Sequence, residues 1–250
     1  MPQIPDLTDP RYLHEVGWFL YYEKYRRYYE NSDRSDSFEE ERLEWSLNLL
    51  NEVLRYCDQD QHWLEDKAVV SIGCGCTGEL AAWPAAAKIG VDPLLYVYQK
   101  LGMLVEDAPG TPQTINLAAD VVDLPLLDNC ADLVVCRNAL DHMPDPEEAL
   151  RQVWRILKKG GALFLSVDIG GPSLPDEPTV FSEESLSALL QDRFDVRVKT
   201  KEDSAYNWNY RNYGVRILAR KKHQASPSTI DKETVLQAYM ERHYRSSTRT

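Results

Sequence analysis

The residues best suited to chemistry lie in the stretch VVSIGCGCTGEL, which runs from Val69 to Leu80. A run of strand-forming residues ends there in three glycines, Gly73, Gly75 and Gly78, spaced G-x-G-x-x-G. Glycine lets a ligand approach the backbone closely and adopts positive φ without strain. Because a strand precedes the glycines and helix-forming residues follow them, the pattern predicts a loop that cradles a nucleotide-like ligand.

Aspartates stand at or near the ends of later strand-like segments. Asp92 ends IGVD, Asp120 ends TINLAAD and Asp168 ends ALFLSVD. In a parallel sheet these ends share one edge, where ligands bind, and the Asp92 carboxylate can accept hydrogen bonds from both hydroxyls of a ribose. At this point a nicotinamide dinucleotide fits as well as another adenosine-bearing cofactor.

The cysteines do not indicate a metal site or a disulfide framework. Their number is odd, and the positions are Cys57, Cys74, Cys76, Cys130 and Cys136. Cys74 and Cys76 are separated by one residue, whereas zinc motifs use two to four, and no second pair lies at ligand spacing. We therefore expect no bound metal.

The first section of the chain, residues 1–66, is predicted to be a helical cover. Aromatic residues recur three and four positions apart on one helix face, at Trp18, Tyr21, Tyr25 and Tyr28. Trp18, Tyr21 and Tyr25 are candidates for lining a substrate pocket, although such a stripe more often docks a helix on its neighbours. Ser37 with Glu40 forms a capping box that predicts a second helix, with an apolar stripe at Leu43, Leu47, Leu50 and Leu54.

The second section, residues 67–223, alternates strands and helices, which predicts a parallel sheet covered on both faces. A helix begins at Asp145 as N-cap with Pro146 in its first turn, and Gly160 predicts its end. The segment ELAAWPAAAK predicts a helix that Pro84 shortens or kinks. Two strands close this section, and residues 224–250 are predicted to add one amphipathic helix and a tail.

The charge of the chain limits its partners. The net charge of −12 disfavours nucleic acid, because a phosphate backbone would be repelled. There is no long apolar run and no basic region followed by an apolar one at the start. We expect a cytoplasmic protein with no membrane partner, as a monomer or homodimer.

Four further segments follow the glycines in order: AADVVDLPLLDNCADLVVC, NALDHMPDPEEAL, RQVWRILKKGGALFL and the closing YGVRILARK. With them the chain resembles the class I S-adenosylmethionine-dependent methyltransferases over most of residues 68–222. The resemblance implies a Rossmann-like α/β fold. Its seven-stranded sheet is mostly parallel with an antiparallel last strand, and the N-terminal helical cover is added to it. The resemblance also disfavours the nicotinamide cofactor.

By this resemblance the cofactor is S-adenosylmethionine, with S-adenosylhomocysteine as product. The glycine loop would pass under its methionine and ribose portions, Asp92 would hold the ribose hydroxyls, and Asp120 would accept from the adenine amino group, with Asp123 as the alternative. The full set of expected cofactor residues is Gly73, Cys74, Gly75, Gly78, Asp92, Pro93, Asp120, Val121 and Asn138.

The expected reaction is methyl transfer to an oxygen or nitrogen of a small-molecule metabolite. His142 is the candidate general base, since it follows the fourth strand and an imidazole can take a proton from a hydroxyl or an ammonium. The alternatives are packing of His142 at the sheet edge, a cofactor-binding scaffold without turnover, and a non-methyl transfer or cyclisation that uses the same cofactor.

Overall fold

The computed structural model describes residues 35–174, 177–202 and 213–222, together with residues 6, 8, 9, 12, 13, 15, 17, 21 and 24. The helix predicted in residues 224–250 therefore lies outside the described residues, as do Trp18 and Tyr25. Most of residues 1–34 lie outside them as well, so the predicted division into three sections stays a prediction.

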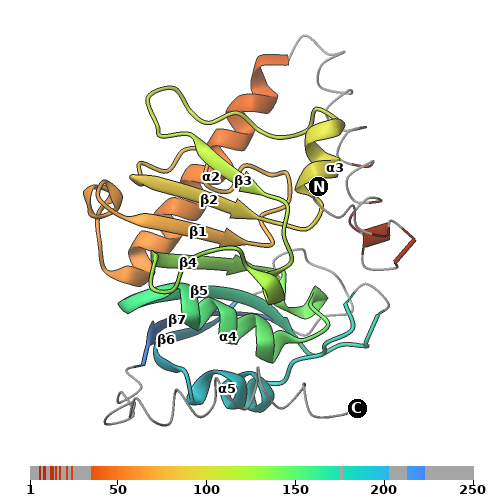
Figure 1. The fold of residues 1–250 in the computed structure, drawn as a ribbon, viewed down its shortest axis with the longest axis vertical. Helices are drawn as coiled ribbons and strands as arrows, with labels where there is room; N and C mark the ends of the chain where they lie inside the picture. Colours follow the sequence, from red (N-terminus) through yellow and green to blue (C-terminus); the bar gives the residue numbers. More distant parts are fainter. Residues whose placement is uncertain are drawn as a thin grey trace, which may run out of the picture.

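Seven strands form one sheet in the order β3-β2-β1-β4-β5-β7-β6 (Figure 1). Neighbouring strands pair in parallel from β3 to β5, and β7 runs antiparallel between β5 and β6. This confirms the predicted sheet. The strands are β1 (Ala68–Ile72), β2 (Ala87–Val91), β3 (Thr114–Leu117), β4 (Ala131–Arg137), β5 (Leu157–Ile169), β6 (Phe194–Glu202) and β7 (Tyr213–Lys221).

The strand order reverses between β1 and β4, which places a crevice outside their carboxyl ends. Helices α2 (Ser35–Cys57), α3 (Leu95–Lys100), α4 (Pro146–Ile156) and α5 (Glu183–Gln191) surround the sheet. Three short 3₁₀ turns complete the described elements: η1 (Gln61–Leu64), η2 (Val121–Asp123) and η3 (Leu140–His142). No helix was expected where α3 lies.

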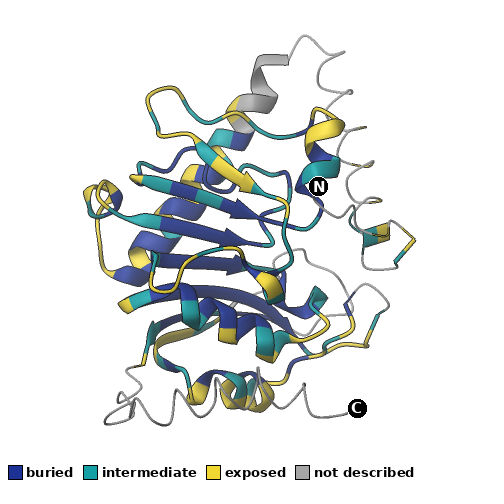
Figure 2. Cartoon of the chain, viewed as in Figure 1, coloured by how far each residue is buried: buried dark blue, intermediate teal, exposed yellow. Residues whose placement is uncertain are grey.

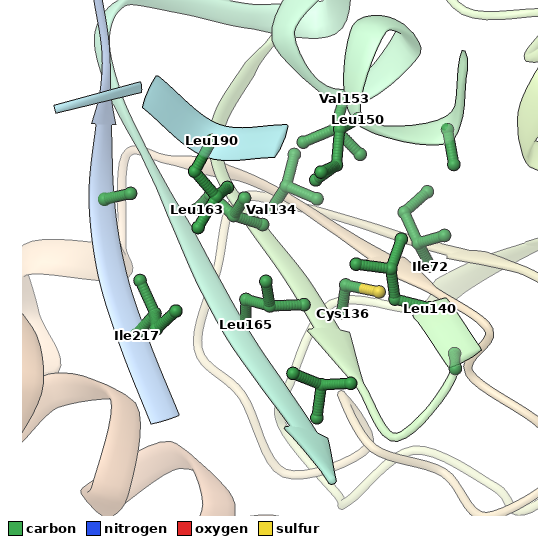
Figure 3. Packing of buried hydrophobic residues seen from close by; sticks show 14 of the residues in the cluster. Ile72, Val134, Cys136, Leu140, Leu150, Val153, Leu163, Leu165, Leu190 and Ile217 are labelled. Carbon is green, nitrogen blue, oxygen red and sulfur yellow. The ribbon is translucent and has the colours of Figure 1, made fainter. Parts of the chain in front are cut away.

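Alternation along the central strands sends side chains to two separate cores. Val134 and Cys136 of β4 point to the face covered by α4 and α5, where they meet Leu150 of α4 and Leu190 of α5 (Figure 3). Leu133 and Val135 of β4 belong instead to the core under α2. Helices on both faces were predicted, and the buried strands at the centre of Figure 2 show why: neither face of these strands is exposed.

The start of α4 is as predicted and its end is not. The Asp145 side chain accepts from the Glu148 backbone N–H at 2.9 Å, and Pro146 is the first helical residue. The helix ends at Ile156 rather than Gly160, because Leu157 already pairs with Ala131 of β4. Pairing with a buried strand thus ends the helix one turn before its glycine.

Helix α2 also differs in detail from the prediction. It begins at Ser35, so Ser37 is inside the helix and is not its cap. Leu50 and Leu54 are buried as predicted, but Leu47 is 44 % exposed. The buried stripe contains Ser46, Leu49, Leu50, Val53, Leu54 and Cys57. Over the described residues no helix is long and apolar enough to cross a membrane.

The segment after the glycine loop is a turn and not the predicted helix. Pro84 lacks a backbone donor, and side chains from elsewhere take over the backbone bonds. The Ser46 hydroxyl accepts from Ala82 N at 3.0 Å, and the buried Lys88 ammonium donates to the Leu80 and Ala81 carbonyls. These long-range bonds hold the segment in an irregular conformation.

Candidate functional site

A cavity of about 190 Å³ lies at the carboxyl ends of β1, β2, β3 and β4. Nine of the residues expected to serve the site line it: Gly73, Cys74, Gly75, Asp92, Pro93, Asp120, Val121, Asn138 and His142. They come from segments far apart in sequence, and the sheet brings them to one edge, as the parallel arrangement predicts.

Gly73 and Gly75 make the floor of the cavity and need to be glycine for different reasons. Both have positive φ, +67° at Gly73 and +56° at Gly75. A Cβ on Gly73 would lie 2.3 Å from the Ala139 Cβ, so close packing of β1 against the segment after β4 excludes a side chain there. A Cβ on Gly75 would meet no atom within 4 Å, because it would enter open space.

Gly78 has another environment. It does not line the main cavity but a smaller one beside it, and a Cβ there would lie 2.7 Å from the Val105 Cβ. In this structure the third glycine of the pattern therefore serves packing of the chain on itself.

Asp92 is buried and holds the loop in shape. Its Oδ2 accepts from the Gly75 N–H at 3.0 Å, and its Oδ1 accepts from the Leu94 N–H at 2.8 Å. Each carboxylate oxygen has a second acceptor position, so the group can also receive ligand hydroxyls. Burial raises the pKa of this carboxyl to about 7 despite the two backbone bonds, which lower it.

Asp120 and Val121 form the end of the cavity beyond β3. Asp120 caps the turn η2, its Oδ1 accepting from the Val122 N–H at 3.1 Å. Asp123, the alternative contact for an adenine, is exposed and is not part of the lining.

Asn138 and His142 follow β4 on the opposite side of the cavity. Asn138 has φ +48°, an uncommon conformation that asparagine tolerates, and its N–H donates to the Ser166 carbonyl at 2.8 Å. His142 ends η3 with its side chain 15 % exposed, and its Nδ1 lies 3.9 Å from Glu15 Oε1. The imidazole is thus largely shielded from solvent and faces a carboxylate.

Two buried acids lie beside His142. One donor atom each from Asp141, His142 and Glu177 lies within 4.8 Å of the others, a grouping that could hold a metal ion. The loop that carries Glu177 is tied to the segment after β4, since the Thr179 N–H donates to the Asp141 carbonyl at 3.2 Å. The expectation of no metal rested on cysteine spacing and did not consider this group.

Arg137, Glu79 and Trp45 form a third part of the lining, which sequence reasoning missed. The Arg137 guanidinium lies 4.7 Å from the centre of the Trp45 ring, and its Nη1 lies 3.8 Å from Glu79 Oε1. Ser71 Oγ donates to Glu79 Oε2 at 2.6 Å. Burial raises the pKa of Glu79 to about 7, against the lowering effect of Arg137 and Ser71.

The thiols of the loop are structural. Burial raises the pKa of Cys76 to about 12 and that of Cys74 well above its usual value, so neither is a thiolate near neutral pH. Buried Arg42 donates to the Cys76 carbonyl at 3.1 Å. Burial lowers the Arg42 pKa to about 10, which leaves it charged at neutral pH.

Of the three aromatic candidates for a substrate pocket, the structure describes Tyr21, and this residue lies outside the cavity lining. Tyr21 is 56 % exposed. Trp18 and Tyr25 lie outside the described residues, so their substrate role stays a prediction. Among the described residues of this section, Tyr12, Glu15 and Trp45 line the cavity.

None of the residues missed by sequence reasoning belongs to a recognisable motif. Glu79 directly follows the third glycine and Arg137 directly precedes Asn138, so proximity to the motifs was the available signal. Trp45, Tyr98 and Glu177 reach the cavity only through tertiary contacts.

The lining fits S-adenosylmethionine by its donor and acceptor chemistry. The buried Asp92 carboxylate suits ribose hydroxyls, the space in front of Gly75 is a cradle that a Cβ would fill, and the acids around it suit a ligand with a sulfonium and an ammonium group. Arg137 adds a cation for a carboxylate.

Comparisons with known proteins agree with this fit. Residues 70–165 match the methyltransferase domain family. The chain is 31 % identical over 126 residues to the ubiquinone biosynthesis O-methyltransferase of Coxiella burnetii, covering 48 % of this chain and 51 % of that protein. The corresponding protein of Nitrosomonas europaea is 29 % identical over 117 residues, covering 45 % and 48 %. The chain thus spans about half the length of the curated relatives it matches.

A solved structure shares the fold. An S-adenosylmethionine-dependent methyltransferase from Methanosarcina mazei superposes with a TM-score of 0.51 at 20 % identity, covering 65 % of this chain and 97 % of that one. The solved structure shows the fold alone, and the glycine loop, the strand order and the family match over residues 70–165 together support a class I S-adenosylmethionine-dependent methyltransferase domain in this part of the chain.

Proposed function

We propose that this protein transfers a methyl group from S-adenosylmethionine to a hydroxyl oxygen of a small molecule. The observation that carries the proposal is the position of His142 in the wall of the same cavity as Gly73, Gly75, Asp92 and Asp120. A cofactor held by those residues would present its methyl group to the space that the imidazole faces.

When bound, S-adenosylmethionine supplies an electrophilic methyl group on a sulfonium sulfur. The chain contributes position and proton transfer. Holding two reactants at near-attack distance contributes up to about 7–11 kcal/mol in the best intramolecular cases. A hydroxyl must also lose its proton, and His142 takes it as a general base. The imidazolium formed faces Glu15 at 3.9 Å, which stabilises its charge.

Oxygen is favoured over nitrogen because the relatives from Coxiella burnetii and Nitrosomonas europaea are named ubiquinone biosynthesis O-methyltransferases. A small acceptor is favoured because the described residues that line the cavity include five acids against one Lys or Arg, and this negative charge disfavours a phosphate backbone. The proposed partner is therefore a small hydroxylated molecule.

The test is transfer of methyl label from S-adenosylmethionine into a cell extract, fractionated into small molecules, lipids, glycans, protein and RNA. Label is expected in the small-molecule fraction, in an ether linkage stable to base. Asp92→Ala should abolish it by weakening cofactor binding, whereas exposed Asp123→Ala should leave it unchanged. Label only in RNA or protein, or no label from a protein that binds S-adenosylhomocysteine, would contradict the proposal.

A further inference from the structure

Arg137 is the single Lys or Arg among the described residues that line the cavity. Its side chain is 14 % exposed. Within the described part of the chain its polar contacts are the ion pair with Glu79 at 3.8 Å and the face of the Trp45 ring at 4.7 Å. Neither is a hydrogen bond, so a largely buried guanidinium keeps its donors for something else.

A guanidinium carries five N–H donors in a planar fork, and that fork matches the two oxygens of a carboxylate. Burying a charged donor without an acceptor is unfavourable. Arg137 lines the cavity, and Trp45 and Glu79 contact its guanidinium without accepting a hydrogen bond from it. The missing acceptor is therefore expected to come from the ligand.

Trp45 and Glu79 fix where the guanidinium points. Glu79 Oε2 is engaged by the Ser71 hydroxyl at 2.6 Å, which holds the carboxylate in place. Its Oε1 attracts Arg137 from 3.8 Å without taking a hydrogen bond. The ring of Trp45, on α2, supports the guanidinium by a cation–π contact.

The strand order gives the direction in which a ligand extends. Asp120 follows β3, Asp92 follows β2, Gly73 follows β1 and Arg137 ends β4, and these four strands are neighbours in this order. A ligand with its adenine at Asp120 and its ribose at Asp92 thus continues over Gly73 toward Arg137. In S-adenosylmethionine this far end is an α-amino acid with a carboxylate.

We infer that Arg137 binds the α-carboxylate of the cofactor through its guanidinium fork, with Trp45 and Glu79 as positioning residues. The inference rests on the cofactor assigned in the proposed function and adds to it a residue that no motif marks. It makes Arg137 the group that distinguishes a cofactor with an intact amino-acid end from one without the carboxylate.

The test is calorimetry of the full chain with two ligands. S-Adenosylhomocysteine carries the carboxylate, and its decarboxylated form, S-adenosyl-3-thiopropylamine, lacks only that group. Arg137→Met should weaken binding of S-adenosylhomocysteine about 10- to 100-fold, the range for a hydrogen bond to a charged group. Binding of the decarboxylated ligand should change less than about twofold. Arg137→Lys, which keeps the charge without the fork, should lose less for the first ligand.

The matched control is Arg216→Met. Arg216 is equally buried, with 14 % of its side chain exposed, but it pairs with Glu52 at 2.5 Å and does not line the cavity. It should leave both affinities unchanged. Equal losses for both ligands in Arg137→Met and Arg137→Lys would overturn the inference, since they would show distortion of the site. Unchanged affinity for S-adenosylhomocysteine would also overturn it, in favour of an anionic acceptor or a structural role. If the wild-type protein did not bind S-adenosylhomocysteine, that result would instead contradict the proposed function itself.

Discussion

The two walls of the cavity are built in different ways. The β1–β3 wall (Gly73, Gly75, Asp92 and Asp120) consists of residues that stand at the ends of successive strands and bond to backbone close by. Asp92 joins two turns through Gly75 and Leu94. The β4–β5 wall (Arg137, His142, Glu177 and Glu15) is assembled from several segments of the chain, and in it His142 lies close to Glu15 and Glu177.

The difference shows how the cavity divides its tasks. A wall of backbone groups and two acids suits a nucleoside, a rigid ligand that would be the same in every turnover. A wall of side chains carried on turns and loops adapts to other chemistry, because loop residues tolerate substitution better than strand ends do. Binding of the nucleoside part of the cofactor and reaction with the acceptor are therefore expected to respond separately to mutation, whereas Arg137 in the β4–β5 wall is expected to bind the other end of the cofactor.

The largest effect is expected from His142→Ala in the β4–β5 wall. Loss of a general base lowers the rate by about 10²- to 10⁴-fold, while the affinity for S-adenosylhomocysteine should change less than about twofold, because the cofactor residues are untouched. Steady-state kinetics with an identified hydroxyl acceptor, together with calorimetry, separate the two quantities.

His62→Ala is the control for this prediction, since His62 is exposed and paired with Glu65 away from the cavity. An unchanged kcat in His142→Ala would show that the acceptor needs no base here and would remove the catalytic role of His142. A parallel loss of cofactor affinity would show that the two walls are not independent.

Two substitutions in the glycine loop separate the packing role of the β1–β3 wall from its role in binding the cofactor. Gly73→Ala forces a Cβ to within 2.3 Å of Ala139 at φ +67°, and should lower the free energy of unfolding by about 2–4 kcal/mol. Gly75→Ala adds a Cβ in open space at φ +56°. It should cost only about 1–2 kcal/mol of stability but weaken cofactor binding, because its methyl group occupies the cradle.

Denaturant unfolding and calorimetry on both variants check this prediction. Unchanged cofactor affinity in Gly75→Ala would mean that the space in front of Gly75 is not where the ligand lies, and a Gly75→Ala protein less stable than Gly73→Ala would contradict the close packing at Gly73. Gly110→Ala is the control for strain alone, since it has φ +85°, meets no atom within 4 Å and is not in the cavity lining.

The same division explains what the sequence could predict. The parallel sheet, the cap of α4 and the β1–β3 wall were indicated by local patterns, namely alternating strands and helices, glycines after a strand, acids at strand ends and a proline after an N-cap. The seven strands with an antiparallel last one followed from the resemblance to a family. The helix expected after the glycines is absent because Lys88 and Ser46 bond the backbone of that turn, and helix α4 ends early because Leu157 joins the sheet. Arg137, Glu177 and Trp45 depend on tertiary contacts, which no spacing in one sequence reveals.

The smallest expected effect is a dependence of stability and of ligand affinity on pH between 5.5 and 8. Burial raises the pKa of Asp92 and Glu79 to about 7, above their ordinary values of 3.8 and 4.5. From about pH 4 to 7 the folded protein therefore holds more protons than the unfolded chain, so stability falls as pH rises through 7. The carboxyls whose pKa is lowered, such as Glu148 and Glu183, act in the opposite direction only below this window.

A ribose donates hydrogen bonds best to an ionised Asp92, so affinity for S-adenosylhomocysteine should rise as pH increases through 7, by about tenfold between pH 6 and 8. The apo protein should accordingly melt at a lower temperature at pH 8 than at pH 6, and saturating ligand should narrow the difference. Thermal melts and calorimetry across this range check both signs. Asp92→Asn, which cannot ionise, should weaken binding and flatten its pH dependence. If the affinity of that variant depended on pH as steeply as the affinity of the wild-type protein, the titrating group would be Glu79 and not Asp92. The pH dependence would then come from the side of the cavity where Arg137 lies and not from the β1–β3 wall.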